Sequence, residues 1–94
     1  MKLKINKNNR EIVENPNEFL LADIKKILKK SSSLEKLHRD ELDEIITLLA
    51  LILCSDDRGQ VMVGSEEELS DFINENFSYL KNCAVNILIK IFGN

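Results

Sequence analysis

The stretch that decides the fold is Ile45–Cys54, which reads IITLLALILC. Nine of these ten residues are apolar, and the exception, Thr47, can return its hydroxyl to the backbone of its own helix. Because a helix without a polar face belongs inside a protein, this segment is expected at the centre of the fold. Just upstream, Asp40 is an N-cap candidate in an acidic run that suits the first helical turn. We therefore predict a buried central helix at residues 40–54.

Two further helices are indicated by start signals and helical spacing. Asn15 is a candidate cap for a helix over residues 16–30, with Pro16 at the first helical position. Its apolar side chains recur at helical intervals. A capping box that starts at Ser65 predicts a helix from about residue 66 to residue 76.

Residues 77–92 fit either a helix or a strand. Leu80, Ala84, Ile87, Leu88 and Ile91 make a helical stripe, whereas alternate residues from 85 to 91 make a strand face. A run of 16 residues without Gly or Pro favours the helix, and Gly93 is a plausible helix stop.

The segments at residues 1–13 and 60–63 have weak β character. The first alternates around an Asn-rich centre and reads as a short hairpin or as an extended arm, and the second is too short for a helix between its two glycines. The predicted fold is thus mainly α. We expect one globular domain over residues 1–94, a bundle of about four helices around the central one, with a minor strand or hairpin from these two segments.

No catalytic, cofactor or metal site is recognisable. The single histidine, His38, reads as a surface or boundary residue, and two cysteines 29 positions apart do not make a zinc site. Cys54 and Cys83 lie in apolar segments and are expected as buried free thiols, with a disulfide as the alternative. A glycine-rich phosphate loop is absent from the sequence, and the loop around Gly59 lacks the carboxylates of a calcium loop. We therefore expect a protein that is not an enzyme and needs no cofactor.

The chain is also expected to be soluble and cytoplasmic. Its first residues, MKLKINKNN, contain no apolar core of a secretory signal. The longest apolar run has about half of the ~20 residues that are needed to span a bilayer. No contact with a membrane is therefore predicted.

Charge is segregated along the sequence. Residues 1–39 contain ten Lys and Arg against five Asp and Glu, whereas residues 40–80 contain one basic residue, Arg58, against eleven acids. The structural explanation is that the acids serve helix capping and solvation, while the lysines of the first predicted helix face the acidic half within the fold. The functional alternative is an acidic face that docks a basic partner surface by charge complementarity. Its predicted residues are Asp56, Asp57, Glu66, Glu67, Glu68 and Asp71.

The leading hypothesis is a small protein-binding module. In size and acidity the chain resembles small immunity proteins and antitoxins in general, a resemblance that rests on no motif. It implies an inhibitor that neutralises a basic effector, such as a nuclease toxin, through the acidic face. The alternatives are a nucleic-acid-binding regulator that uses the Lys25–Lys30 face, and a homo-oligomer or structural subunit of a larger assembly. The acidic balance makes nucleic acid the less expected ligand.

Overall fold

The computed structural model describes residues 3–93 and is mainly helical. Its α-helices are α1 (Arg10–Glu14), α2 (Glu18–Ile27), α3 (Arg39–Leu53), α4 (Glu66–Glu75) and α5 (Phe77–Phe92). Short 3-10 turns, η1 (Lys7–Asn9) and η2 (Leu34–Lys36), precede α1 and α3. The predicted helical class is confirmed. Four of the five α-helices in the described residues lie where helices were predicted, and α1 lies in the segment that was predicted as a hairpin or an extended arm.

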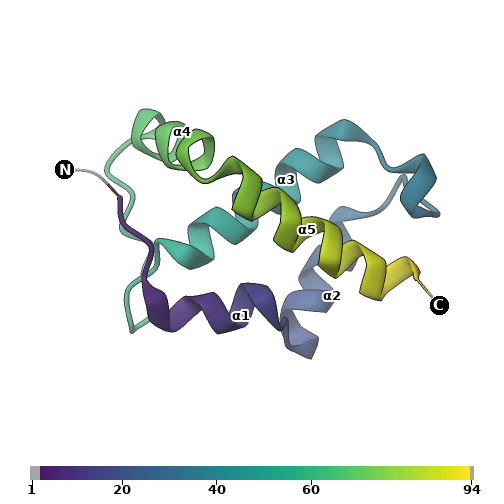
Figure 1. Ribbon diagram of the computed structural model, residues 1–94, viewed down its shortest axis with the longest axis horizontal. Helices are drawn as coiled ribbons and strands as arrows, with labels where there is room; N and C mark the ends of the chain where they lie inside the picture. The colour runs from purple at the N-terminus through teal and green to yellow at the C-terminus, as the bar shows by residue number, and fades with distance from the viewer. Residues whose placement is uncertain (1–2, 94) are drawn as a thin grey trace.

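Helix α3 is the central element, as its sequence predicts. It contacts α1, α2, α4 and α5, and α5 crosses in front of it in Figure 1. Thr47 donates its hydroxyl to the carbonyl of Asp43 at 2.9 Å, as expected. The helix is not enclosed on every side, because Leu48 and Leu51 are only half-buried. A domain of this size has too little mass to surround a helix completely.

The core is one cluster of buried side chains to which every α-helix contributes. α1 provides Val13, α2 provides Leu20 and Ile24, and α4 provides Phe72. The larger shares come from α3 and α5: Ile45, Ile46, Leu49, Ala50 and Leu53 from the former, and Leu80, Cys83, Ala84, Ile87 and Leu88 from the latter.

The ambiguous segment at residues 77–92 is the helix α5. The helical stripe predicts which side chains are buried: Leu80, Ala84, Ile87 and Leu88 all belong to the core. The strand pattern fails because Ile89, which it would place with Ile87, is exposed. Gly93 follows the last turn, as predicted.

The predicted strand or hairpin from residues 1–13 and 60–63 is wrong for the part that the structure describes. Residues 3–6 form neither a strand nor a helix, and η1 and α1 follow them; residues 1 and 2 of the predicted segment lie outside the described residues. The backbone N–H of Asn6 donates to the carbonyl of Leu53 at 2.8 Å, so the arm meets the end of α3 rather than a strand. In the other segment a single antiparallel bridge joins Ser55 and Val61.

The arm takes this path because the end of α3 has carbonyls without helical partners. The side-chain amide of Asn9 donates to the carbonyls of Ile52 and Ser55, at 2.9 Å each. The amide of Asn6 donates to the same Ser55 carbonyl at 3.0 Å. The Asn-rich stretch that suggested a hairpin turn therefore caps a helix C-terminus.

Helix α2 is shorter than the predicted 16–30, and its cap differs. Asn17, not Asn15, accepts the hydrogen bond from the N–H of Leu20, at 2.9 Å, so the helix begins at Glu18. It ends at Ile27, and the chain that follows buries Ser31 against the start of α3, where its hydroxyl lies 2.8 Å from Glu41 Oε1. The cap of α3 also differs: His38 occupies that position and its side chain makes no capping bond.

Cys54 and Cys83 are buried and free, so the disulfide alternative is excluded. None of the helices within residues 3–93 has the length and apolar character of a membrane span.

Candidate functional site

The predicted acidic face begins in the turn after α3. Asp56 organises this turn: its Oδ1 accepts from the backbone N–H groups of Arg58, at 2.9 Å, and Gln60, at 2.8 Å. Gly59 has a φ of +82°, a conformation that suits glycine, and its N–H donates to the Asp56 carbonyl at 3.0 Å. The carboxylate of Asp56 is therefore used by the fold itself.

Asp57 ties the same turn to the N-terminal arm. Its Oδ1 accepts from the side-chain amides of Asn6 and Asn8, at 3.1 Å each. These hydrogen bonds hold the pKa of Asp57 below its ordinary value, the bond from Asn6 having the larger effect. A second predicted site residue thus has a structural role that its position in the sequence did not indicate.

The start of α4 carries the other four predicted acids. Ser65 caps the helix by accepting from the N–H of Glu68 at 3.2 Å, and Glu68 accepts from the N–H of Gly64 at 3.0 Å. Glu66, Glu67 and Asp71 are exposed, and within residues 3–93 they form no hydrogen bond or ion pair through their side chains. These three residues are the part of the predicted face that the fold leaves unused.

A groove of about 550 Å³ connects the turn with α4. Asp56 and Glu68 both line it, together with residues of the arm and the buried Cys54. Met62, which is 58% exposed, also lines the groove, and the neighbouring Val61 is 41% exposed. Sequence reasoning assigned Val61 and Met62 to a strand and missed them as surface residues; an apolar run between two glycines in an acidic loop was the available signal.

The thiol of Cys54 is not poised for nucleophilic chemistry in this groove. Burial raises its pKa to about 11, so it stays protonated at neutral pH. Burial also raises the pKa of the Cys83 thiol. Neither cysteine is therefore an activated thiolate.

The lysine face at residues 25–30 lies opposite acids of α3. Lys26, Lys29 and Lys30 line a hollow of about 420 Å³ whose other wall includes Asp40, Glu41 and Glu44. Lys30 Nζ lies 3.8 Å from Asp40 Oδ2. The lysines therefore face carboxylates within the fold, which removes part of the basic surface that a nucleic acid would need.

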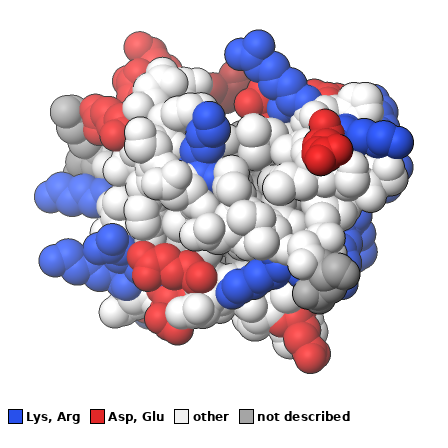
Figure 2. Space-filling model, turned by 45° about the vertical axis from the view of Figure 1, so that its right-hand side comes forward, with Lys and Arg blue, Asp and Glu red and all other residues white. Residues whose placement is uncertain are grey.

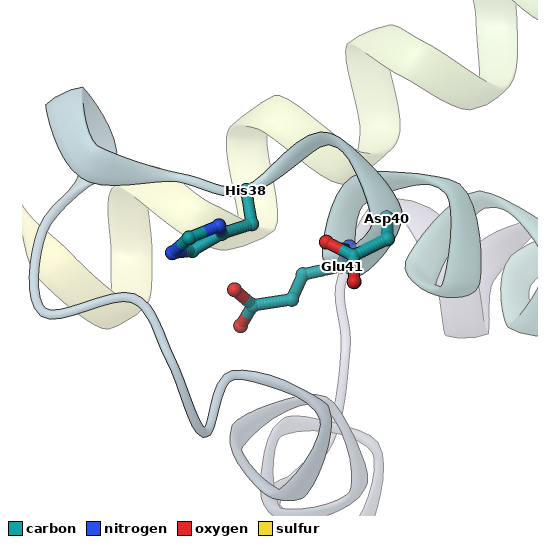
Figure 3. A group of neighbouring side chains, drawn as sticks. All are labelled: His38, Asp40 and Glu41. Carbon is teal, nitrogen blue, oxygen red and sulfur yellow. Dashed lines mark hydrogen bonds between the residues drawn. The ribbon is translucent and has the colours of Figure 1, made fainter.

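A polar cluster lies beside this hollow at the start of α3. Glu41 is only 3% exposed; its Oε1 lies 2.8 Å from the hydroxyl of Ser31, and its Oε2 has no hydrogen-bond partner. His38 and Asp40 are exposed, and Figure 3 shows their side chains on either side of the Glu41 side chain. The expected surface position of His38 is confirmed. The burial of Glu41 was not predicted.

One face of the molecule carries little charge at its centre (Figure 2). In the view of Figure 2 the centre is largely uncharged, and acidic and basic side chains are placed mainly around its rim. Segregation of charge along the sequence therefore does not make every surface of the folded protein strongly acidic or basic.

Comparison with known proteins adds no family to this description: no family model, curated protein or solved structure matches the chain.

Proposed function

We propose that the protein is a small, non-enzymatic binding module that docks a basic protein partner on the surface formed by the 56–64 turn and the start of α4. Its most concrete form is an immunity-type inhibitor that acts in the cytoplasm and neutralises a basic effector, such as a nuclease toxin. Carboxylates would occupy the positions that phosphates take in such an effector, and the bound inhibitor would block access to its site.

One observation carries this proposal. Glu66, Glu67 and Asp71 are exposed and unpaired within the described residues, and the exposed Met62 lies beside the same groove as Glu68 of their helix. Charge beside exposed apolar surface combines rapid, steered association with burial of apolar area in the complex. Two free, buried cysteines are also typical of proteins from a reducing compartment.

The test is capture of the partner from the source cell's lysate by purified wild-type protein and two charge-reversal variants. The double change Glu67→Lys and Asp71→Lys is expected to abolish capture. The matched control is Asp23→Lys with Glu35→Lys, which makes the same change in net charge at exposed acids outside this surface. It should retain capture, and both variants should melt within a few degrees of wild type.

Salt and nuclease treatment identify the class of partner. A basic protein that is lost at high salt, and kept after nuclease treatment, supports the proposal. If the two double variants captured the partner equally well, the surface at the start of α4 would not be the binding surface. Nucleic acid in the eluate, lost when Lys25, Lys26, Lys29 and Lys30 are changed to Ala, would instead support the regulator alternative.

Phe19 favours a second candidate, a homo-oligomer or a subunit of a larger assembly. Its ring is 82% exposed on α2, although residues on the same helix are buried. Phe is one of the residues that are enriched at protein–protein interfaces relative to the rest of the surface. Sedimentation velocity of the pure protein tests the homo-oligomer form. A dimer that Phe19→Ser converts to a monomer would support it, and a monomer at every concentration would exclude it.

A further inference from the structure

Three side chains that are typical metal ligands converge where α3 begins. One ligand atom each from His38, Asp40 and Glu41 lies within 4.8 Å of the other two. Figure 3 shows the Glu41 carboxylate extending beneath the His38 ring from the first turn of the helix. We propose that this cluster binds a divalent transition-metal ion such as Zn²⁺. The proposal is independent of the acidic surface on α4.

Glu41 is the residue that distinguishes this cluster from an ordinary acidic helix start. It is 3% exposed, and the single hydrogen bond to its carboxylate leaves Oε2 buried and without a partner. A buried polar atom without a partner costs free energy, and more so when it belongs to a charged group. A cation bound at Oε2 would remove this cost.

Ser31 positions the carboxylate for this role. Its hydroxyl lies 2.8 Å from Glu41 Oε1 and 3.2 Å from the carbonyl of Lys36, and it accepts from the backbone N–H of His38 at 3.1 Å. Outer hydrogen bonds of this kind hold metal-binding carboxylates in orientation. Ser31 therefore engages one oxygen of Glu41 and leaves the other without a hydrogen bond.

The neighbouring lysines do not occupy the position of the ion. Lys26, Lys29 and Lys30 line the adjacent hollow, yet within residues 3–93 Glu41 forms no ion pair with any of them. The pair of Lys30 and Asp40, at 3.8 Å, is largely exposed on both sides and is therefore weak. Two carboxylates also outweigh the roughly half positive charge of the helix N-terminus.

The donor set indicates which ions fit. One imidazole nitrogen and two carboxylate oxygens suit Zn²⁺ and related first-row ions, with water completing a tetrahedral site. Ligand atoms about 2.0–2.2 Å from such an ion lie roughly 3.3–3.6 Å from one another. His38 and Asp40 are exposed, so their side chains have room for the small movement that this requires, although Asp40 Oδ1 also accepts from the backbone N–H of Glu41 at 3.1 Å. Mg²⁺ and Ca²⁺ prefer oxygen ligands and should bind far more weakly.

The test is titration of the full chain, without an affinity tag, with Zn²⁺ by calorimetry and with Co²⁺ by visible absorption. One ion per chain is expected, with a tetrahedral cobalt spectrum. His38→Gln and Glu41→Gln should each abolish this binding. Ser31→Ala should weaken it by about tenfold, the lower end of the effect of outer-shell changes. The matched control, Glu44→Gln, removes a carboxylate one turn from Asp40 and should leave affinity unchanged.

Three results would overturn the proposal. They are no Zn²⁺ uptake by the wild-type chain, equal affinity in wild type and His38→Gln, or an intense thiolate-to-cobalt band, which would assign the metal to cysteine. His38 is exposed, so His38→Gln keeps the test decisive even if Glu41→Gln does not fold.

Discussion

Tyr79 in α5 donates a hydrogen bond of 2.6 Å to Glu14 Oε1 in α1, across 65 positions of sequence. Arg10 completes the contact: its guanidinium carbon lies 5.2 Å from the centre of the Tyr79 ring, and its Nε lies 3.6 Å from Glu14 Oε1. Val13 is the only buried residue of α1, so α1 has little apolar contact with the core. The polar contact with Tyr79 therefore helps to attach α1 to α5.

Tyr79→Phe should lower the free energy of unfolding by about 1 kcal/mol, the value of one hydrogen bond. Burial and then the bond to Glu14 raise the pKa of Tyr79 to about 12, from an ordinary value of 10. A pKa raised in the folded state means that stability is fully present below pH 10 and is lost as the pH rises to 12. Urea denaturation at pH 8 and pH 11 should therefore show that the advantage of wild type over Tyr79→Phe shrinks at the higher pH. An equal difference in unfolding free energy between wild type and Tyr79→Phe at both pH values would contradict this prediction.

Cys54→Ala should remove a separate pH dependence. Because burial raises the pKa of Cys54 from 9.0 to about 11, its contribution to stability is present below pH 9 and is lost between pH 9 and pH 11. Wild type should lose stability more steeply than Cys54→Ala across that range. Reaction with a thiol reagent gives a second measurement. Cys54 and Cys83 should react slowly in the native protein and fully in urea, and rapid native labelling would count against their burial.

Asn17→Ala should cost about 1 kcal/mol of stability, because it removes the side-chain cap of α2. Asn15→Ala is the matched control: it removes one exposed hydrogen bond, from Asn15 to Glu11 at 3.0 Å, and should cost a few tenths at most. Thermal melts of the two variants would show whether the cap lies where the structure places it. A larger loss of stability for Asn15→Ala than for Asn17→Ala would indicate that Asn15 is the cap, as the sequence suggested.

Leu49→Ala should destabilise the protein by about 3 kcal/mol, since Leu49 is fully buried and its truncation leaves a cavity in the core. Leu51→Ala, two residues further along α3 at a half-buried site, should cost clearly less. Leu49→Asp is expected to prevent folding, because it places a charge without a partner in the core. A Leu49→Asp protein that is soluble and melts cooperatively would contradict the central position of α3.

Asn6→Ala should loosen the arm from the end of α3 at a cost of roughly 1–2 kcal/mol, because it removes the amide bonds to the Ser55 carbonyl and to Asp57. Asn8→Ala removes only the second bond to Asp57 and should cost less. Amide hydrogen exchange should speed up in the 55–60 turn of Asn6→Ala while the middle of α3 stays protected. If exchange in Asn6→Ala became faster along the whole of α3, the effect of the arm would not be local to the end of that helix.

The candidate site shows the limit of charge patterns read from sequence. Acidic residues near a helix start or a turn are visible in the chain, but their partners are not. Asp57 is held by Asn6 and Asn8, which lie 51 and 49 positions away. Of the six predicted acids, Asp56, Asp57 and Glu68 accept hydrogen bonds that organise the fold, and Glu66, Glu67 and Asp71 remain exposed.

The sequence by itself determined the helical class, the central place of α3 and the start of α4, because helical periodicity and a capping box are encoded within a few neighbouring residues. Only the tertiary structure decided the path of the arm and the burial of Glu41. Asn6 and Asn9 are residues typical of a turn, but here the backbone N–H of Asn6 and the side-chain amide of Asn9 cap α3, because its last carbonyls have no partner further along the helix. Glu41 has the sequence context of an exposed first-turn acid, and it is buried because the chain after α2 brings Ser31 against it.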